Sequence, residues 1–311
     1  MKGKDLLSVS DLPGKEIEAL ILDAVDLKKR GYLTTLSGKS LALLFEKPSL
    51  RTRVSFEMAM RQLGGEVIYL SPAEVGLGKR EAISDVARVL SRYVDCLALR
   101  TFSHDTLEEF ARNSAVPVIN ALSDLEHPCQ TLADLLTIYE KKGELHGLTL
   151  AYIGDGNNVA HSLMLGSALT GINFRIASPD GYRVKEEILG ESREYARENN
   201  SEILLLTDPR EAVRDADVVY TDVWTSMGQE EEAEIRRKAF TGYQVNESLL
   251  DLASPGVIFM HDLPAHYGEE VAEGIFDDPR AVVFDQAENR LHAQKALLAY
   301  LLGGLGVSSA R

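Results

Sequence analysis

The sequence predicts an α/β protein of two domains, each a mainly parallel sheet flanked by helices. Short runs rich in apolar and β-branched residues alternate with segments of helical period along the whole chain. Nearly continuous apolar strands of this kind are typical of parallel sheets that helices cover on both faces. The polar stretch at residues 141–147 interrupts the alternation, so we expect the boundary between two similar halves there.

Each predicted strand is a short apolar run between turn-forming residues. In the first half these runs are 40–46, 66–70, 96–100 and 116–120. In the second half they are 148–154, 173–178, 217–223, 257–261 and 281–286. The segments between these runs have the apolar periodicity of helices. Residues 11–30, for example, combine one apolar stripe with acidic residues early and basic residues late, which suits the dipole of a helix.

Composition limits the possible partners. The formal net charge is −15 at pH 7 and no long basic block offsets it, so neither nucleic acid nor an anionic membrane is an expected partner. No apolar run approaches the roughly 20 residues that span a bilayer, and no signal peptide is evident. Cys96 and Cys129 are too few for a disulfide framework. We therefore expect a soluble cytoplasmic protein.

The chemistry is expected just after the strands, because ligands of parallel α/β sheets bind at the carboxyl ends of the strands. After the first strand, Pro48 turns the chain and residues 49–53 begin a helix. Two hydroxyls, guanidinium groups and free backbone N–H groups at a helix start can hold an anion, most naturally a phosphate. An ordinary N-cap with arginines that face solvent explains these residues equally well.

Further donors follow other strands of the first half and the start of the last helix. Arg100 ends the run 96–100, and His127 and Gln130 stand at a helix start, where both could donate to a substrate carbonyl oxygen. Arg290 lies near the beginning of the C-terminal helix. Each also has a purely structural interpretation, as a surface arginine, a buried histidine bonded to backbone, or an exposed helix residue.

In the second half, the segment "AYIGDGNNV" has the strand, turn and helix start of a dinucleotide site. Only Gly154 and Gly156 are present, and Asn158 stands where a third small residue would come, so NAD is a weak interpretation. Asn157 and Asn158 could instead offer their amides to a polar ligand.

The end of the run 217–223 and the loop after it suit a ligand that carries an ammonium group. Asp222 ends this strand and provides a carboxylate. Ser226, Met227 and Gly228 follow it as a loop that could close over a ligand.

The segment "FMHDLPAHYGEEV", residues 259–271, gathers two histidines and three carboxylates. Read by ligand type alone, it predicts the metal site of a hydrolase. Metal-binding histidines are usually fixed on regular elements, however, and Pro264 and Gly268 interrupt this segment. A metal-dependent hydrolase therefore stays a remote alternative, as does a nicotinamide-dependent dehydrogenase.

Together these groups describe transfer from an acyl-phosphate-like donor to an amine. The segments "SLRTR", "HPCQ", "DVWTSMGQE", "HDLPAHYGEE" and "FDQAENRLHAQKA", in this order and spacing, closely resemble the motifs of the ornithine carbamoyltransferases. The resemblance covers nearly the whole chain. The D-x-x-x-S-M-G segment points to ornithine rather than aspartate as the acceptor. A transcarbamoylase for another amine, such as putrescine or an acylated ornithine, is the nearest alternative.

The resemblance implies a role for each domain. Residues 1–140 with 288–311 would bind carbamoyl phosphate, because the C-terminal helix would cross back to the first domain. Residues 141–287 would bind L-ornithine. The expected assembly is a homotrimer or a multiple of trimers, with the loop Gly76–Arg80 reaching a neighbouring site.

The resemblance also assigns residues to these roles. The catalytic residues would be Arg51, Arg100, His127 and Asp262. The carbamoyl phosphate-binding residues would be Ser49, Leu50, Arg51, Thr52, Arg100, His127, Pro128, Gln130, Asp262, Leu263 and Arg290. The ornithine-binding residues would be Asn158, Asp222, Ser226 and Met227.

The implied reaction belongs to arginine metabolism and needs no metal, cofactor or covalent intermediate. The neutral δ-amine of ornithine would attack carbamoyl phosphate, and the tetrahedral intermediate would collapse to citrulline and phosphate. Positioning two substrates can contribute about 7–11 kcal/mol to such a step.

One residue departs from the family pattern. The usual motif is His-Cys-Leu-Pro, whereas this chain has His261-Asp262-Leu263-Pro264. The cysteine of relatives lies beside the reacting amine. A carboxylate there would favour the charged ammonium, so we expect Asp262 to orient the amine, to accept its proton and to shift the optimum to higher pH. Alternatively, the Asp262 side chain turns away from the site.

Overall fold

In the computed structural model, the chain forms two compact units. The first unit comprises Met1–Leu136 with Asn289–Arg311, and the second comprises Thr137–Glu288. The structure describes residues 4–77, 80–226 and 228–303. The unit boundaries fall inside two helices, α6 (Pro128–Lys142) and α12 (Val283–Leu302). Among the described residues, no helix is long and apolar enough to cross a membrane.

The first unit is built on a four-stranded parallel sheet of order β2-β1-β3-β4. The strands are β1 (Ser40–Phe45), β2 (Glu66–Leu70), β3 (Cys96–Arg100) and β4 (Val118–Leu122). Besides α6 and α12, the helices of this part are α1 (Gly14–Arg30), α2 (Leu50–Gln62), α3 (Pro72–Val75), α4 (Ile83–Leu90) and α5 (His104–Asn113), with a 3-10 turn η1 (Val9–Asp11).

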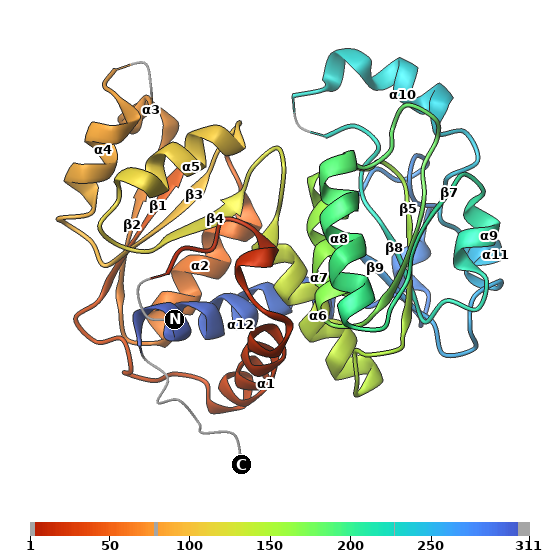
Figure 1. The fold of residues 1–311 in the computed structure, drawn as a ribbon, viewed down its shortest axis with the longest axis horizontal. Coiled ribbons are helices and arrows are strands. Elements are labelled where there is room, and N and C mark those ends of the chain that lie inside the picture. The colour runs from red at the N-terminus through yellow and green to blue at the C-terminus, as the bar shows by residue number, and fades with distance from the viewer. Residues whose placement is uncertain (1–3, 78–79, 227, 304–311) are drawn as a thin grey trace. The chain divides into compact units, whose positions relative to one another are not determined.

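The side chains of β1 and β3 alternate between the two faces of this sheet and are buried on both. Ala42 and Leu44 of β1 pack with Leu97 and Leu99 of β3 against α4 and α5, whose largest contribution is Phe110. Figure 1 shows α4 and α5 on one side of these strands and α2 and α12 on the other. Coverage of both faces explains why the inner strands β1 and β3 are apolar almost throughout rather than alternating.

The C-terminal helix packs on helices of the first unit, as predicted. The Nζ atom of Lys295 donates to Leu27 O of α1 at 3.1 Å and to Gln62 Oε1 of α2 at 3.3 Å. Lys28 Nζ donates to Asn289 Oδ1 at 2.9 Å. These bonds tie the last helix to two helices from the beginning of the chain.

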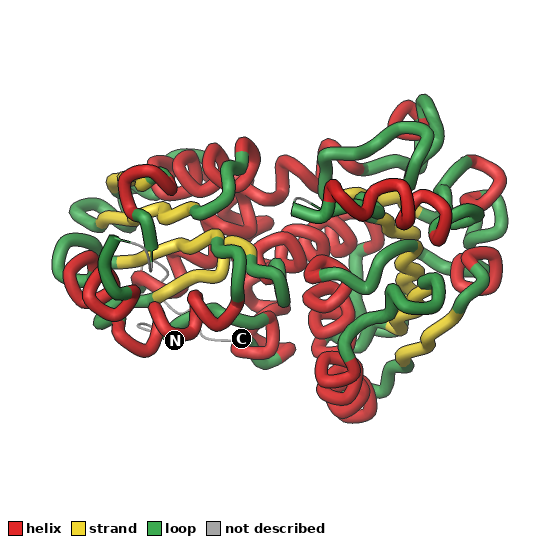
Figure 2. The backbone as a smooth tube through the Cα atoms, turned by 90° about the horizontal axis from the view of Figure 1, so that it is seen from above, coloured by secondary structure: helices red, strands yellow, loops and turns green. Residues whose placement is uncertain are grey.

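The second unit is built on a five-stranded parallel sheet of order β7-β6-β5-β8-β9. The strands are β5 (Thr149–Ile153), β6 (Asn173–Ala177), β7 (Ile203–Leu206), β8 (Val218–Thr221) and β9 (Ile258–His261). The helices are α7 (Asn158–Leu169), α8 (Glu186–Glu198), α9 (Pro209–Val213), α10 (Ala233–Ala239) and α11 (Glu247–Leu250), with 3-10 turns η2 (Glu230–Glu232) and η3 (Ile275–Asp277). Figure 2 shows helices on both sides of the strands in each unit.

The two faces of the second sheet differ in character. On one face Tyr152 stacks with Tyr220 and Phe174, at ring separations of 5.7 and 6.5 Å. On the other, smaller strand residues such as Ala151 and Ala177 leave room for aromatic residues from the connections, among them Phe240. The sheet is therefore filled by large strand side chains on one face and by inserted loop and helix residues on the other.

The fold class predicted from the sequence is confirmed, but one predicted strand is wrong and one strand was missed. Residues 281–286 are not a strand: Ala281 makes an isolated bridge with Phe259, and α12 begins at Val283. The burial of Val283 and Gln286, with Phe284 67% exposed, follows helical period. The strand β7 was not predicted. It is short and lies at the sheet edge, so its apolar run gives a weak pattern.

Candidate active site

In the first unit, the start of α2 has the form that the sequence predicts. The Oγ atom of Ser49 accepts a hydrogen bond from Thr52 N at 3.3 Å and caps the helix. Thr52 is buried, whereas Leu50 is 77% exposed. Arg51 is half-buried and forms no ion pair with any residue that the structure describes. Backbone N–H groups, a hydroxyl and a guanidinium thus gather at one helix start.

Arg53, the second arginine of this segment, is engaged elsewhere. Its Nε atom pairs with Glu57 Oε1 at 2.8 Å, and its guanidinium lies 3.8 Å from the ring centre of Tyr69. Of the two arginines at this helix start, Arg53 is therefore the one that faces solvent.

Arg290 connects three helices of the first unit. Its Nη2 atom donates to Thr52 Oγ1 of α2 at 3.0 Å, and its Nη1 atom donates to Gln130 Oε1 of α6 at 2.5 Å. Gln130 in turn donates from Nε2 to Asp134 Oδ1 at 2.8 Å. All four side chains are almost fully buried. Arg290 is thus buried and hydrogen-bonded to side chains of two other helices, and the interpretation as an exposed helix residue is wrong.

His127 lies just before α6, which begins at Pro128, and is 3% exposed. Burial, reinforced by the positive charges of Arg290 and Arg100, holds the pKa of His127 well below its ordinary value. The imidazole is therefore neutral near pH 7. A neutral histidine among cations can donate one N–H to an oxygen without adding a proton to the reaction.

Arg100 ends β3, and a second cation that the sequence analysis missed lies near it. Lys47 follows β1, and its Nζ atom lies 4.6 Å from the ring centre of Phe102. Burial and the charge of Arg100 lower the pKa of Lys47. Lys47 could have been predicted as a candidate, because it also follows the end of a strand. Two cations, Lys47 and Arg100, therefore lie near each other at these strand ends, with the carboxylates of Asp124 and Glu46 also close to Lys47.

In the second unit, the turn between β5 and α7 is organised by Asn157. Its Oδ1 atom accepts from Val159 N and Ala160 N at 3.0 and 3.1 Å, and its Nδ2 atom donates to Asp222 Oδ2 at 2.6 Å. Asn157 is therefore an N-cap and a support for Asp222 rather than a side-chain amide presented to a ligand. Asn158, the first residue of α7, is half-buried at the same turn.

Asp222 and Asp262 come from neighbouring strands that are in register. Thr221, the last residue of β8, pairs with His261, the last residue of β9. The next residue on each strand is an aspartate, and side-chain atoms of both aspartates and His261 lie within 4.8 Å of one another. The negative charges of Asp222, Asp155 and Asp262 join burial in raising the pKa of Tyr152 well above its ordinary value, so these carboxylates share one region.

Asp155, which follows β5, already has a cation within the protein. Arg236 donates from Nη1 to Asp155 Oδ2 at 2.7 Å, and both side chains are nearly buried. Burial raises the pKa of Asp155 to about 6, although the charge of Arg236 acts in the opposite direction. The oxygens of Asp222, by contrast, accept from the neutral donors Asn157 Nδ2 and Val223 N, at 2.6 and 2.7 Å.

The turn that carries Asp262 is held by His261. Leu263 N donates to His261 Nδ1 at 2.9 Å, and His261 Nε2 lies 3.3 Å from Glu270 Oε1. These bonds place the imidazole proton on Nε2. Glu270 also accepts from His266 N at 2.5 Å. Leu263 has a φ of 58°, a conformation that residues other than glycine seldom adopt.

Two sets of side chains have the composition of a metal site. They are Asp222, His261 and Asp262, and His266, Glu269 and Glu270. In the first set the Nδ1 lone pair of His261 is already used by Leu263 N. In the second, Glu269 pairs with Arg237 at 2.9 Å. In each set, one candidate ligand therefore already has a partner within the protein.

Ser226 belongs to the loop after Asp222. Its backbone N–H donates to Gln229 Oε1 at 3.1 Å, so the loop begins with a local turn. Met227 lies outside the described residues, as do residues 78–79 of the predicted loop Gly76–Arg80.

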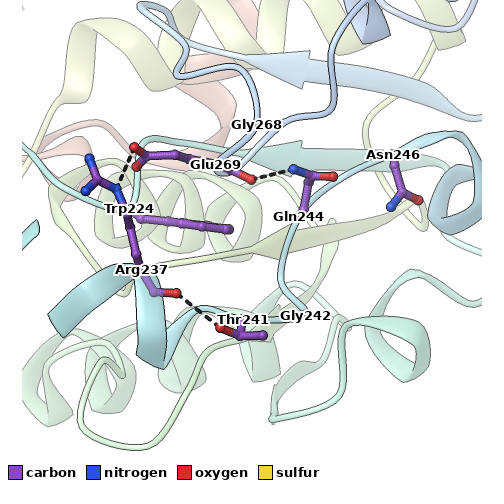
Figure 3. A pocket seen from close by; sticks show the side chains of 8 residues that line it. All are labelled: Trp224, Arg237, Thr241, Gly242, Gln244, Asn246, Gly268 and Glu269. Atoms are coloured by element: carbon purple, nitrogen blue, oxygen red, sulfur yellow. Dashed lines mark hydrogen bonds and ion pairs between the residues drawn. The ribbon is translucent and has the colours of Figure 1, made fainter. Parts of the chain in front are cut away.

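A surface hollow of about 470 Å³ lies elsewhere on the second unit. Figure 3 shows Arg237 directed at Glu269, which also accepts from Gln244 Nε2 through its backbone oxygen at 3.0 Å. The arginine and the glutamate neutralise each other, so this hollow has no dominant charge. None of the predicted site residues lines it.

The predicted residues thus fall into two groups. Ser49, Leu50, Arg51, Thr52, Arg100, His127, Pro128, Gln130 and Arg290 belong to the first unit, and Asn158, Asp222, Ser226, Asp262 and Leu263 belong to the second. Two parallel-sheet units, each with polar and charged side chains at the carboxyl ends of its strands, define a two-domain α/β protein of the kind that binds ligands at those ends.

Comparison with known proteins gives this class its family. The carbamoyl-P binding domain of aspartate/ornithine carbamoyltransferase matches residues 4–140, and the Asp/Orn binding domain matches residues 146–301. The chain belongs to the aspartate/ornithine carbamoyltransferase family. The resemblance found in the sequence motifs is confirmed.

Individual relatives are similar over nearly their whole length. The ornithine carbamoyltransferase of Anoxybacillus flavithermus is 55% identical over 306 residues, covering 97% of this chain and 98% of that protein. The solved structure of ornithine carbamoyltransferase from Pyrococcus furiosus has a TM-score of 0.94 at 50% identity and 98% coverage of both chains. The anabolic enzyme from Campylobacter jejuni has a TM-score of 0.92 at 41% identity, covering 96% of this chain and 98% of that one.

Proposed function

We propose that this protein is an ornithine carbamoyltransferase, which transfers the carbamoyl group of carbamoyl phosphate to the δ-amine of L-ornithine and releases citrulline and phosphate. Relatives that carry this name are 50% or more identical to this chain over nearly its full length. The single observation that carries the proposal is the division of the predicted site residues, with the cations Arg51, Arg100 and Arg290 in one unit and the neighbouring carboxylates of Asp222 and Asp262 in the other.

The first unit would bind carbamoyl phosphate. The start of α2, with Ser49, Leu50, Arg51 and Thr52, suits the phosphate, and the charge of Arg100 would assist. His127 suits the carbamoyl oxygen, because burial keeps it neutral and able to donate one N–H. Gln130 and Arg290 would complete the pocket, since the guanidinium fixes the orientation of the amide.

The second unit would bind L-ornithine. Asp222 suits the α-ammonium group, and Asn158 at the start of α7 suits the α-carboxylate. Ser226 and Met227 would close over the amino acid. Asp262 and Leu263 would meet the carbamoyl group and the reacting amine at the end of β9.

The reaction would depend on positioning and charge. The neutral δ-amine attacks the carbamoyl carbon, and Arg51, Thr52, Arg100 and His127 stabilise the oxyanion of the tetrahedral intermediate. The C–O bond to phosphate then breaks. Each oxyanion donor of this kind contributes about 2.7–4 kcal/mol in enzymes where it has been removed.

The wider setting of the enzyme is part of the proposal. Residues 1–140 with 288–311 would form the carbamoyl phosphate domain, and residues 141–287 the ornithine domain, supported by the family matches over 4–140 and 146–301. A role in arginine biosynthesis is supported by relatives named anabolic. We also propose a homotrimer or a multiple of trimers in the cytoplasm.

One assay tests the proposal directly. The protein is incubated with carbamoyl phosphate and L-ornithine, putrescine, N-acetylornithine or L-aspartate, and both phosphate release and the ureido product are measured. We expect citrulline from ornithine, with the other acceptors at least about a hundredfold slower, since each lacks a group that the site recognises. Carbamoylation of another amine without citrulline would contradict the proposal.

A further inference from the structure

We propose that Asp134 is a positioning residue, which holds the side-chain amide of Gln130 in one orientation toward the carbamoyl group of the donor substrate. This inference rests on the proposed function and deepens it. Asp134 would act through Gln130 rather than by contact with a substrate, so it adds a buried carboxylate to a site whose other charged groups in the first unit are cations.

The first argument is the place of Asp134 on α6. Gln130 and Asp134 are four residues apart, so their side chains lie on the same face of the helix, one turn from each other. The Nε2 atom of Gln130 donates to Asp134 Oδ1 at 2.8 Å. Both partners of this bond therefore belong to one helix, and its geometry does not depend on the conformation of a loop.

The second argument is that the Gln130 amide has a charged partner at each end. Its Oε1 atom accepts from Arg290 Nη1 at 2.5 Å, while its Nε2 atom donates to Asp134. A guanidinium can only donate, and an ionised carboxylate can only accept. The reverse orientation would place the amide nitrogen against the guanidinium and the amide oxygen against the carboxylate. Both hydrogen bonds would then be lost, so the two partners together select one orientation.

Burial makes these two bonds decisive. Gln130 is 1% exposed and Asp134 has no exposed surface, so water cannot easily replace either partner of the amide. The neighbouring residues Leu132, Leu135 and Leu136 of α6 are buried and apolar. Burying a carboxylate in such surroundings costs free energy unless its oxygens are used. An apolar residue at position 134 would avoid that cost, so the carboxylate indicates a specific polar role.

The two bonds also determine which groups Gln130 can offer to a ligand. A side-chain amide has two N–H groups and two carbonyl lone pairs. Among the residues that the structure describes, Asp134 takes one N–H and Arg290 takes one lone pair, which leaves one of each. The carbamoyl group also has N–H groups and a carbonyl oxygen. The remaining N–H and lone pair of Gln130 complement these groups, and Asp134 prevents their exchange.

The hydrogen bonds form a row with two different ends. Asp134 lies at one end, and Thr52 lies at the other, at the start of α2 that would bind the phosphate. Gln130 and Arg290 lie between them. A change at Asp134 removes no hydrogen bond between Arg290 and Thr52. We therefore expect such a change to disturb the position of the carbamoyl group and to leave the binding of phosphate intact.

The first test compares carbamoyl phosphate with inorganic phosphate, which has no carbamoyl group. In Asp134→Asn, we expect kcat/KM for carbamoyl phosphate, at saturating L-ornithine, to fall about tenfold, because a hydrogen bond to a charged acceptor becomes a neutral one. We expect the inhibition constant of inorganic phosphate to stay within about twofold, because the phosphate contacts are separate from Asp134. A general disturbance of the unit would weaken both.

A matched variant makes the same chemical change elsewhere in the first unit. Asp95 also accepts hydrogen bonds, from Lys39 Nζ at 2.6 Å and from Ser40 N at 2.9 Å. It precedes β3, whereas the predicted site residues lie at the opposite, carboxyl ends of the strands. Asp95→Asn should therefore leave kcat/KM and the inhibition constant of phosphate within about twofold of wild type, whatever its effect on stability.

The second test reverses the hydrogen-bond pattern. Gln130→Glu replaces the donor Nε2 by an acceptor and places two carboxylates together, so kcat/KM and the melting temperature should both fall. Adding Asp134→Asn supplies a donor. In this background the substitution should raise the melting temperature and raise kcat/KM at least about fivefold, although it lowers kcat/KM in wild type. A role of Asp134 that is independent of Gln130 would have the same sign in both backgrounds.

Each outcome has one meaning. Equal losses of kcat/KM and phosphate affinity in Asp134→Asn would overturn the inference alone, as would a fall or no change when Asp134→Asn is added to Gln130→Glu. If Gln130→Glu does not fold, the comparison with inorganic phosphate decides by itself. Failure of the wild-type protein to make citrulline would overturn the proposed function, and the role of Asp134 toward the carbamoyl group with it.

Discussion

Each unit holds a buried charged side chain, a cation in the first and a carboxylate in the second. In the first unit, a buried guanidinium, Arg290, is held by Thr52 and Gln130, which are both neutral. In the second, the buried carboxylate of Asp222 is held by Asn157 and the backbone, which are also neutral. In both cases these hydrogen bonds join a buried charged side chain to neutral groups.

Asp155 shows the alternative within the same sheet. It follows β5 as Asp222 follows β8, yet Arg236 neutralises it at 2.7 Å. A carboxylate that is paired with an arginine contributes to the structure, whereas one held by neutral donors keeps its charge for a ligand. Under the proposed function, the kind of partner, more than burial, separates the ligand-binding carboxylate of Asp222 from the structural carboxylate of Asp155.

The largest expected effect comes from removing the buried guanidinium of Arg290. Arg290→Met keeps much of the side-chain length but deletes the charge and leaves Gln130 Oε1 and Thr52 Oγ1 without their donor. We expect kcat/KM to fall about 1,000-fold, since a buried donor and the orientation of Gln130 are lost together. Steady-state kinetics with both substrates measure this.

A matched variant separates this effect from a general loss of an arginine. Arg280 pairs with Asp278 and Asp251 in the second unit, away from the predicted residues. Arg280→Met should keep kcat/KM within about twofold, because its partners Asp278 and Asp251 are not predicted site residues. If Arg290→Met kept more than a tenth of the wild-type activity, Arg290 would be a packing residue.

The next effect concerns His127 and the pH profile. Because burial and two arginines hold its pKa well below the ordinary value, His127 is neutral near pH 7 and loses this state only as pH falls through the lowered pKa. His127→Asn should reduce kcat about 100-fold and leave the acid limb where it is. Exposed His146→Asn is the control. An acid limb that disappears with His127 would show instead that His127 titrates in the working range.

The sequence predicted the fold where periodicity was strong. Parallel strands such as β1 and β5 are apolar because both faces are covered, and their bounds agree with the prediction to within one residue at each end. The edge strand β7 was missed and the start of α12 was mistaken for a strand, because a short apolar run fits either element. Only the pairing of Ala281 with Phe259 and the helical burial after it decide the second case.

The site residues were predictable as types and places, but their partners were not. That Asp222 and Asp262 follow strands can be read from the chain, whereas the register between Thr221 and His261 cannot. Likewise, nothing local indicates that Arg290 reaches Gln130, 160 positions earlier in the chain. Lys47 was missed because the neighbouring helix start explained its segment.

The smallest effect tests the contrast between the paired and the ligand-binding carboxylates. The pKa of Asp155 is about 6 in the folded protein, above its ordinary value of 3.8, so the folded state binds this proton more tightly than the unfolded state. Stability from Asp155 is therefore present at low pH and is lost as pH rises through about 6. Between pH 5 and 7 the free energy of unfolding should fall by about 1 kcal/mol from this group alone. Urea unfolding at both pH values should show that this part of the decrease is absent in Asp155→Asn. An equal decrease in the wild type and the variant would mean that Asp155 stays ionised at both pH values. The charge of Arg236 would then outweigh the effect of burial on the pKa of Asp155.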